Sequence, residues 1–227
     1  MRRGRQDGRD GEFSPSLPLH RCDRIVGLPS GLSMTQNNKF RVYNLLAGLL
    51  PERWRHLRVR ILRICGVTCD DSVIVSAGAR FYGEGHFTFG EHVIVRGDVR
   101  FESNTADGEI FLDKFSEINH GSYVSANDGS HVRIGAHCRV AHFVSLKTSS
   151  HEIDILGNCI GGTPKYRDIT IADGSWLCAG VIVIPGVRIG EKNVVAAGAV
   201  VTKDTEDGVL MAGVPAVVKK RYLNDCQ

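Results

Sequence analysis

A six-residue period in the C-terminal half of the chain restricts its fold more than any other feature of the sequence. Six consecutive units begin with Ile, Leu or Val, at Ile171, Leu177, Val183, Ile189, Val195 and Val201. The second position of each unit is usually small, and glycines recur between the aliphatic residues. The same frame holds at Ile134, Val140 and Leu146, and more loosely at Phe89, Val95, Phe101, Leu112, Ile118 and Val124.

A short fixed period indicates stacked copies of one small unit rather than a globular mixture of elements. Six residues fit a short strand and a turn, with the aliphatic residue pointing inward and glycines at corners that need unusual backbone angles. Three units would make one triangular coil, so about a dozen units predict a prism of about four or more coils. A β-sandwich would instead space its strands about eight to twelve residues apart. The pattern therefore predicts an all-β fold, a parallel β-helix.

Composition and charge narrow the class of protein further. The 227 residues are 42% hydrophobic and 23% charged, which is typical of a soluble globular protein, and 26 glycines suit a fold with many tight turns. A net charge of +3 is too small to indicate a nucleic-acid partner. No stretch reaches the ~20 apolar residues of a transmembrane helix, and no secretory signal is evident. Seven cysteines without paired spacing are most simply reduced thiols in a cytoplasmic protein.

The chain before the repeats has two parts. Residues 1–33 are rich in Arg, Gly, Asp, Ser and Pro, which predicts a disordered arm, and Met34 offers a plausible alternative start, so we hypothesise that the arm is not part of the native protein. Residues 34–66 predict a basic amphipathic helical segment that Pro51 interrupts. Its helices, over 39–64, could pack on the body or contact an anionic membrane surface. The β-helix domain is predicted over 67–220 with a loop at 152–170, followed by a tail at 221–227.

The repeats resemble the hexapeptide-repeat acyltransferases over about residues 73–220. The most specific motifs are Gly174-Ser-Trp-Leu-Cys-Ala-Gly-Val-Ile-Val-Ile-Pro-Gly, Ala196-Ala-Gly-Ala-Val-Val-Thr-Lys-Asp and Ala212-Gly-Val-Pro-Ala. Within that group the sequence is similar to the maltose, galactoside and nodulation-factor O-acetyltransferases and to colanic-acid-type polysaccharide acetyltransferases. The resemblance implies a left-handed coil, a homotrimer with active sites between subunits, and acetyl-CoA as the acyl donor.

His151 is the predicted catalytic base. It ends the unit that starts at Leu146 and precedes an irregular stretch, so its side chain can leave the stacked wall and face a cleft. Acyl transfer to a hydroxyl requires removal of the hydroxyl proton, and an imidazole, with an ordinary pKa near 6.5, suits that role. The family places its catalytic His in a Thr-x-x-His run about two dozen residues before a Trp, as Thr148, His151 and Trp176 do here. A turn histidine with a purely structural hydrogen bond is the alternative.

The resemblance also implies a donor site. Trp176 would line the acyl-donor cleft, Ala179 and Ala197 would let the pantetheine arm approach, and Thr202 and Lys203 would contact the nucleotide end of CoA. Lys220 stands where the family often has Arg, and a lysine beside phosphate is physically sound.

The acceptor side departs from the sugar acetyltransferases. They carry a Phe-x-Asn-x-Asn run, and this chain has Glu117-Ile-Asn-His-Gly121, so Asn119 fits the first Asn and Gly121 replaces the second. Asn119 and His120 are the predicted acceptor-binding residues, with Asn127 as a further candidate. The expected function is acetyl-CoA-dependent O-acetylation of a saccharide, in surface-polysaccharide or O-antigen synthesis, in the cytoplasm or at the inner face of its membrane.

Three other functions stay open at this stage. An N-acyltransferase acting on an amino-sugar nucleotide would need the same base. His120, His137 and His142 imperfectly resemble the metal ligands of γ-class carbonic anhydrases, where three imidazoles hold an ion that activates water. The gap between His120 and His137 is short for that family and Trp176 has no place in it, so no metal is predicted. A catalytically silent β-helix that acts as an assembly scaffold is the last alternative.

Overall fold

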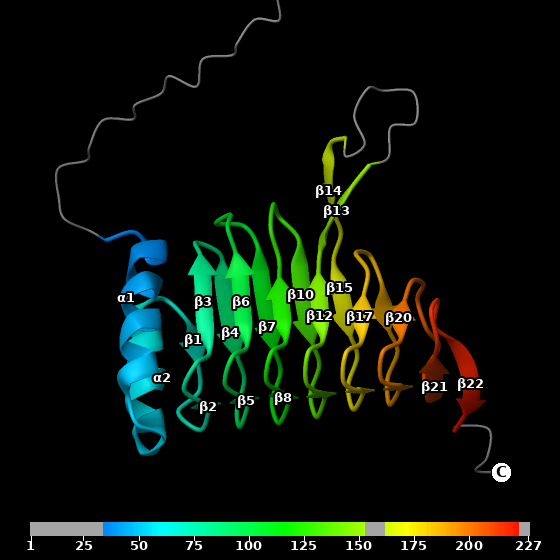
Figure 1. Ribbon diagram of the computed structural model, residues 1–227, viewed down its shortest axis with the longest axis horizontal. Coiled ribbons are helices and arrows are strands. Elements are labelled where there is room, and N and C mark those ends of the chain that lie inside the picture. Colours follow the sequence, from blue (N-terminus) through cyan, green and yellow to red (C-terminus); the bar gives the residue numbers. More distant parts are fainter. Residues whose placement is uncertain (1–33, 153–161, 223–227) are drawn as a thin grey trace, which may run out of the picture. The chain divides into compact units, whose positions relative to one another are not determined.

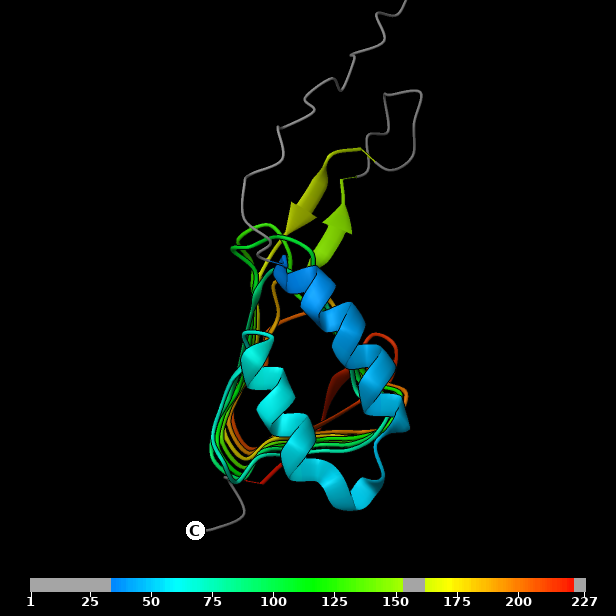
Figure 2. The same ribbon diagram turned by 90° about the vertical axis from the view of Figure 1, so that its left-hand side faces the viewer.

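In the computed structural model, which describes residues 34–152 and 162–222, short parallel strands stack into a β-helix of triangular cross-section (Figures 1 and 2). The predicted arm at 1–33, residues 153–161 of the predicted loop and residues 223–227 of the tail lie outside the described residues. Three sheets run along the axis of the β-helix. Each of the six full coils contributes one strand to each sheet, and two further strands extend the second sheet at the C-terminal end. The predicted fold class is confirmed.

The first sheet contains β1 (Thr68–Cys69), β4 (His86–Phe89), β7 (Glu109–Leu112), β10 (His131–Ile134), β15 (Ile169–Ile171) and β18 (Arg188–Ile189). The second contains β2 (Ile74–Val75), β5 (Ile94–Val95), β8 (Glu117–Ile118), β11 (Arg139–Val140), β16 (Trp176–Leu177), β19 (Val194–Val195), β21 (Val209–Ala212) and β22 (Val217–Arg221). The third contains β3 (Arg80–Gly83), β6 (Arg100–Ser103), β9 (Tyr123–Ser125), β12 (Ser145–Lys147), β17 (Ile182–Val183) and β20 (Val200–Val201). A separate hairpin pairs β13 (Ser149–His151) with β14 (Pro164–Tyr166).

The strand register places the first residue of each six-residue unit beside its equivalent in the next coil. In the second sheet, for example, Ile118 lies between Val95 and Val140, and all three side chains are fully buried. The first and third sheets repeat this arrangement around Leu112 and Val124. Burial contributes about 1.5–3 kcal/mol for each such side chain, so the inward columns are the main source of stability.

In the described coils from β1 to β20, the departures from the six-residue period lie at one corner, where the chain passes from the third sheet to the first. The turns that carry extra residues there are 84–85, 104–108, 126–130 and 148–168, and we call this edge the insertion corner. The longest interval separates the inward residues Leu146 and Ile171 and contains the β13–β14 hairpin, which projects from the β-helix (Figure 1). Variation in length is therefore concentrated at one edge of a regular scaffold.

Two helices cover the N-terminal end of the β-helix (Figure 2). They are α1 (Gln36–Leu49) and α2 (Arg55–Ile64), joined through the 3₁₀ turn η1 (Glu52–Trp54), and the break at Pro51 confirms the predicted helical segment. The ring of Phe40 packs on Phe81 and Phe87, at 5.7 and 5.4 Å between centroids, and so closes the apolar interior at its first coil. No helix in the described ranges is long and apolar enough to cross a membrane.

Arg58 fixes the helix pair to the first coil. Its guanidinium is fully buried, donates hydrogen bonds to the carbonyl oxygens of Leu50, Pro51 and Val75, and lies 3.4 Å from a carboxylate oxygen of Glu52. Glu52 in turn accepts a hydrogen bond from the backbone N–H of Ala77. A buried charge requires such partners, so the angle at which the helices sit is specified by polar contacts as well as by apolar packing.

We predict that Ile134→Ala lowers the free energy of unfolding by about 2–5 kcal/mol, because Ile134 is fully buried in the inward column of the first sheet. Arg133→Ala is the matched control. Arg133 precedes Ile134 on the same strand and points outward, and its exposed ion pair with Glu109 contributes about 0–1 kcal/mol. Chemical denaturation measures both changes, and equal losses would contradict the inward register.

Candidate functional site

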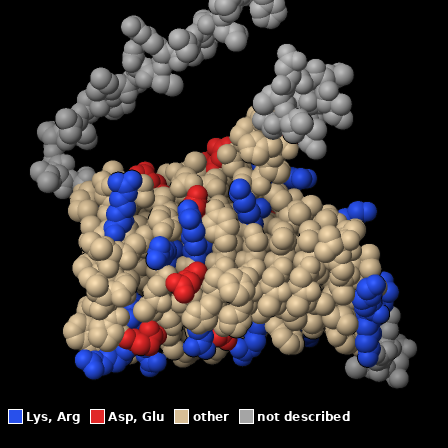
Figure 3. Space-filling model, in the orientation of Figure 1, with Lys and Arg blue, Asp and Glu red and all other residues tan. Residues whose placement is uncertain are grey.

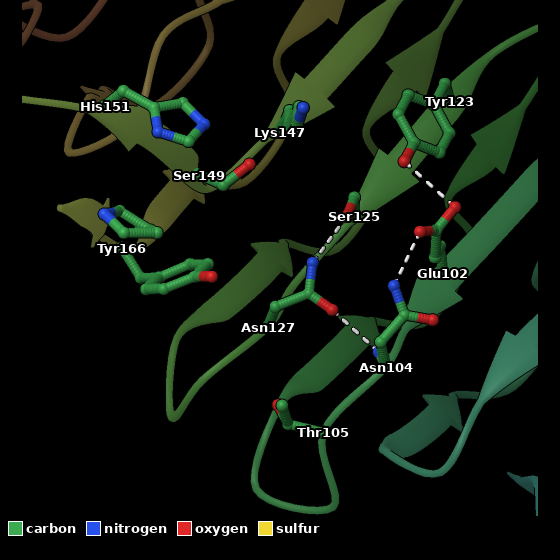
Figure 4. Close-up of a pocket in the computed structure, with 11 residues that line it drawn as sticks. Glu102, Asn104, Thr105, Tyr123, Ser125, Asn127, Lys147, Ser149, His151 and Tyr166 are labelled. Atoms are coloured by element: carbon green, nitrogen blue, oxygen red, sulfur yellow. Dashed lines mark hydrogen bonds between the residues drawn. The ribbon is translucent and has the colours of Figure 1, made fainter. Parts of the chain in front are cut away.

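The turns of the insertion corner come from consecutive coils and together border one pocket of about 300 Å³. Figure 4 shows Ser149, His151 and Tyr166 on one side of it and Glu102, Asn104 and Tyr123 on the other, with Asn127 between them. The lining residues are Glu102, Asn104, Thr105, Tyr123, Ser125, Asn127, Lys147, Ser149, His151, Pro164 and Tyr166. Nearly all are polar or aromatic, which suits a polar ligand rather than an apolar one.

His151 reaches the pocket because the chain leaves the wall of the β-helix at this point. Strands β13 and β14 pair antiparallel, with His151 opposite Pro164, and the imidazole is exposed. Its Nδ1 lies 3.3 Å from the carbonyl oxygen of Gly162. A carbonyl only accepts hydrogen bonds, so Nδ1 carries the proton and Nε2 presents a lone pair. Among the described residues nothing hydrogen-bonds to Nε2, so this nitrogen can accept a proton from a ligand.

The opposite wall is built around the carboxylate of Glu102. It accepts hydrogen bonds from the Tyr123 hydroxyl at 3.0 Å, from Asn104 Nδ2 at 2.7 Å and from Arg100 Nη2 at 2.6 Å. Burial by itself would raise the pKa of Glu102, but the hydrogen bonds from Asn104, Arg100 and Tyr123 outweigh it and hold the pKa below its usual range. Burial, assisted by the nearby carboxylate, raises the pKa of Tyr123. Glu102 therefore stays ionised and Tyr123 protonated near neutral pH.

Side-chain hydrogen bonds connect the turns that follow β6, β9 and β12, which lie on three consecutive coils. Asn127 Oδ1 accepts from the backbone N–H of Asn104 at 2.7 Å, and its Nδ2 donates to Ser125 Oγ at 3.0 Å. One coil further on, the buried hydroxyl of Ser130 donates to Thr148 Oγ1 at 2.7 Å. The pocket is thus held by a network that leaves its walls little freedom, as a binding site requires.

Curated proteins of similar sequence are named as acetyltransferases. No protein-family model matches the sequence. The chain is 36% identical over 116 residues to a galactoside O-acetyltransferase of Lactococcus lactis, covering 48% of this chain and 54% of that protein. It is 32% identical over 129 residues to the putative colanic acid biosynthesis acetyltransferase WcaF of Escherichia coli, covering 57% and 66%. The chain thus spans about half to two thirds of the length of these curated relatives.

Solved structures share the fold. A maltose O-acetyltransferase from Clostridium difficile superposes with a TM-score of 0.59 at 23% identity, covering 82% of this chain and 86% of that one. The Bacillus cereus N-acyltransferase AntD, in complex with dTDP-4-amino-4,6-dideoxyglucose and coenzyme A, gives 0.61 at 19% identity, covering 74% and 92%. A hexapeptide-repeat acetyltransferase from Vibrio cholerae, complexed with acetyl coenzyme A, gives 0.51 at 19% identity over 82% and 87%. At these identities the likeness concerns the fold alone.

In sequence and in fold, the chain is similar to the hexapeptide-repeat acetyltransferases.

The six residues that this resemblance predicts for binding the acyl donor do not lie together within one chain. Trp176 is half-exposed on the second sheet, between Arg139 and Val194. Ala179 and Ala197 are exposed on adjacent coils at the corner between the second and third sheets, where the N–H of Gly198 donates to the carbonyl of Ala179. These two alanines are therefore surface residues at which an extended ligand could approach the backbone, and they are not part of the core.

The remaining predicted donor residues lie nearer the C-terminal end. Thr202 and Lys203 follow β20 directly and so leave the third sheet at the same edge as the His151 hairpin. Lys220 lies on β22, which pairs antiparallel with β21, and its ammonium is 5.5 Å from the ring centroid of Tyr222. The donor roles of all six residues remain predictions.

Asn119 and His120 do not lie in the pocket of His151. Asn119 follows the inward residue Ile118 and therefore faces the corner between the second and third sheets, where its Nδ2 donates to the carbonyl of Val140. His120 is exposed at that corner and its ring stacks on His142, with 5.8 Å between centroids. Within one chain, the pocket beside His151 includes Asn127. It includes neither Asn119 nor His120, whose role in binding the acceptor stays a prediction.

The three histidines of the carbonic-anhydrase alternative do not converge within the chain. His137 stacks on Phe115, at 5.1 Å between centroids, at the corner between the first and second sheets. His120 and His142 lie at the next corner. No group of three or more His, Cys, Asp or Glu side chains in residues 34–152 and 162–222 is placed to hold a metal ion.

Sequence reasoning missed most of the pocket. Glu102, Tyr123 and Tyr166 belong to no recognisable motif, and their approach to His151 depends on which coils stack. One signal was present in the spacing. The inward residues Phe101 and Leu112, and again Val124 and Ile134, are more than six positions apart, which marks the same corner as the longer interval after Leu146.

We predict that Asn127→Ala lowers the free energy of unfolding by about 1–3 kcal/mol, because it removes the acceptor for the N–H of Asn104 and the donor to Ser125. Ser149→Ala is the matched control. Ser149 lines the same pocket and its hydroxyl makes no hydrogen bond within the described residues, so a change within about 0.5 kcal/mol is expected. Denaturant titration of both variants is the measurement, and an Asn127→Ala protein as stable as wild type would show that the turns hold without this network.

Proposed function

We propose that this protein transfers an acetyl group from acetyl-CoA to a hydroxyl of a saccharide, with His151 as the general base. The observation that carries the proposal is the hairpin at the insertion corner, which holds Nδ1 of His151 against the carbonyl of Gly162 and turns Nε2 toward a polar pocket. The relatives named as galactoside O-acetyltransferase and colanic acid acetyltransferase support the reaction class.

In the proposed reaction, the acceptor hydroxyl gives its proton to Nε2 of His151 while its oxygen attacks the thioester carbonyl carbon. The carbon–sulfur bond then breaks, the imidazolium returns the proton to the thiolate, and an ester and free CoA result. The Gly162 carbonyl, which accepts from Nδ1–H, keeps the imidazole in the productive tautomer and stabilises the imidazolium that forms. A positioned base of this kind contributes about 10²–10⁴-fold in rate.

The pocket chemistry supports a saccharide as acceptor. The ring of Tyr166 offers a flat face, and Ser149 and Lys147 offer donors beside His151. Hydrogen-bonding groups held in place by the Asn127 network can orient a ring that carries several hydroxyls. Glu102 and its partners are already hydrogen-bonded to each other, so we assign them to shaping the wall and not to proton transfer.

The donor side leads us to propose a homotrimer. Trp176, Ala179 and Ala197 lie on the second sheet or its far corner, whereas His151 projects from the insertion corner of the same chain. A site formed between neighbouring subunits, as the resemblance implies, would bring one copy's alanine corner toward another copy's hairpin. Thr202, Lys203 and Lys220 would then hold the nucleotide end of CoA. Surface-polysaccharide synthesis, in the cytoplasm, is the process that we propose for the reaction.

Transfer to an amine of an amino-sugar nucleotide is the second candidate. It is favoured by the shared fold with AntD, an N-acyltransferase whose structure contains such an amino sugar. A screen of neutral sugars, acidic sugars and amino-sugar nucleotides, following release of the CoA thiol from acetyl-CoA, separates the two reactions. Calorimetric titration with CoA tests both, since an absence of binding at millimolar concentration would leave only a scaffold.

We predict that His151→Ala reduces acetyl transfer at least 10²-fold while leaving CoA affinity and the circular dichroism spectrum unchanged, because it removes the proton acceptor and only one exposed hydrogen bond, to Gly162. The matched control is His137→Asn, at another corner, where Asn tolerates the positive φ of 57° and activity should stay near wild type. Steady-state assay of thiol release gives both rates. If His151→Ala keeps more than about a tenth of the activity, His151 is not the base.

A further inference from the structure

Helix α1 carries apolar side chains on its outer face as well as on the face that it buries. Phe40, Tyr43 and Ala47 are buried against the first coil of the β-helix. On the opposite face, Leu45 and Leu49 are 70% and 76% exposed, and Val42 is also exposed. A helix that only packs on a protein body shows a polar outer face, whereas a row of large apolar side chains on the outer face indicates that a second surface covers that row.

The neighbouring helix extends this apolar surface. Trp54, Leu57 and Ile64 are exposed on η1 and α2, and Ile64 reaches 74% exposure. Because α1 and α2 lie side by side across one end of the β-helix (Figure 2), their outward side chains share one end of the molecule. We call this set the cap surface: Val42, Leu45, Leu49, Trp54, Leu57 and Ile64.

The helices that carry the cap surface have many more basic than acidic side chains. Glu52 is the one acidic residue between Met34 and Ile64, and its carboxylate lies beside the buried Arg58. Arg63 pairs with Asp71. The exposed residues Arg41, Arg53, Arg55 and Arg60 form no ion pair within the described part of the chain. Figure 3 shows basic side chains, with acidic ones beside them, along the lower edge of this end.

We propose that the cap surface docks end-on onto an anionic lipid bilayer. Leucine, isoleucine and tryptophan side chains would enter the boundary between headgroups and acyl chains, and the unpaired arginines would contact lipid phosphates. Large exposed apolar side chains bordered by arginine on a helix that lies flat are the chemistry that such an interface recognises.

A second copy of the chain fits this surface less well. A two-fold contact through the cap would place Arg41, Arg53, Arg55 and Arg60 of one copy near the same residues of the other, and like charges brought together oppose association. An anionic bilayer neutralises all of them at once.

Docking in this orientation fixes the height of the candidate site above the membrane. The helix layer is about 10 Å thick, and the coils stack about 4.8 Å apart. The pocket is lined by residues on or after β6, β9 and β12, which belong to the second, third and fourth coils counted from the helices. It would therefore lie about 15–25 Å from the bilayer surface. The docking itself does not depend on the proposed chemistry, and its failure would leave the transferase proposal standing.

The test is sedimentation of the full chain with sucrose-loaded vesicles of phosphatidylcholine alone or with about 30% phosphatidylglycerol. We expect binding to the anionic vesicles that weakens as salt is raised. Leu45→Gln/Leu49→Gln should reduce the partition coefficient at least tenfold without loss of helix, since Gln is a good helix former. Val214→Gln/Val217→Gln, which changes two exposed valines near the other end of the β-helix, is the matched control and should bind like wild type.

A second variant tests the charge separately. Arg53→Gln/Arg55→Gln/Arg60→Gln should abolish the preference for anionic over neutral vesicles. The arginines that precede Met34 are the same in every variant, so they do not contribute to the difference between variants. Thermal melts of each variant check folding. The proposal is overturned if wild type does not sediment with anionic vesicles, or if the Leu45/Leu49 variant binds them as well as wild type does. It is also overturned if that variant instead changes the oligomeric state in light scattering, which would assign the surface to a second copy.

Discussion

The stacking of inward aliphatic residues in register is the constraint on which the rest of the structure depends. Each of Leu112, Ile118 and Val124 buries its side chain between equivalents one coil above and one below, so a shift of one residue would expose a whole column. Insertions can therefore survive only at corners. This chain places them at one corner in successive coils, and the candidate site is the result: a pocket made of irregular turns on a scaffold that cannot itself deform.

The same constraint explains how much could be predicted from the sequence. Inward positions such as Ile118 and Leu146 can be identified in the sequence because they recur at a fixed interval, and that recurrence determines the fold. The pocket walls do not repeat. Glu102 on β6 and Tyr123 on β9 border the pocket of His151 because these strands pair in order with β12, which leads into the hairpin. That adjacency follows from the register and not from any local motif.

Asn119 illustrates the limit of motif matching. Its local sequence fits the first Asn of the family run, but its place one residue after Ile118 sends it to the corner between the second and third sheets. Asn127, a weaker candidate from sequence, lies in the pocket because it belongs to a lengthened turn. Counting residues between inward positions is therefore a better guide to this site than matching short polar runs.

The separation of Trp176 and Ala179 from His151 is also a consequence of the rigid scaffold. Trp176 lies on the second sheet and Ala179 at its corner with the third, whereas His151 lies at the insertion corner. The continuous strand pairing of the third sheet between these two corners offers no hinge that could bring them together. An acyl transfer needs its base and thioester within about 3–3.5 Å of the reacting atoms. The proposed trimer would meet this condition by placing Trp176 and Ala179 of one copy beside the His151 hairpin of another. A monomer that retained full transferase activity would contradict this arrangement while leaving the role of His151 intact.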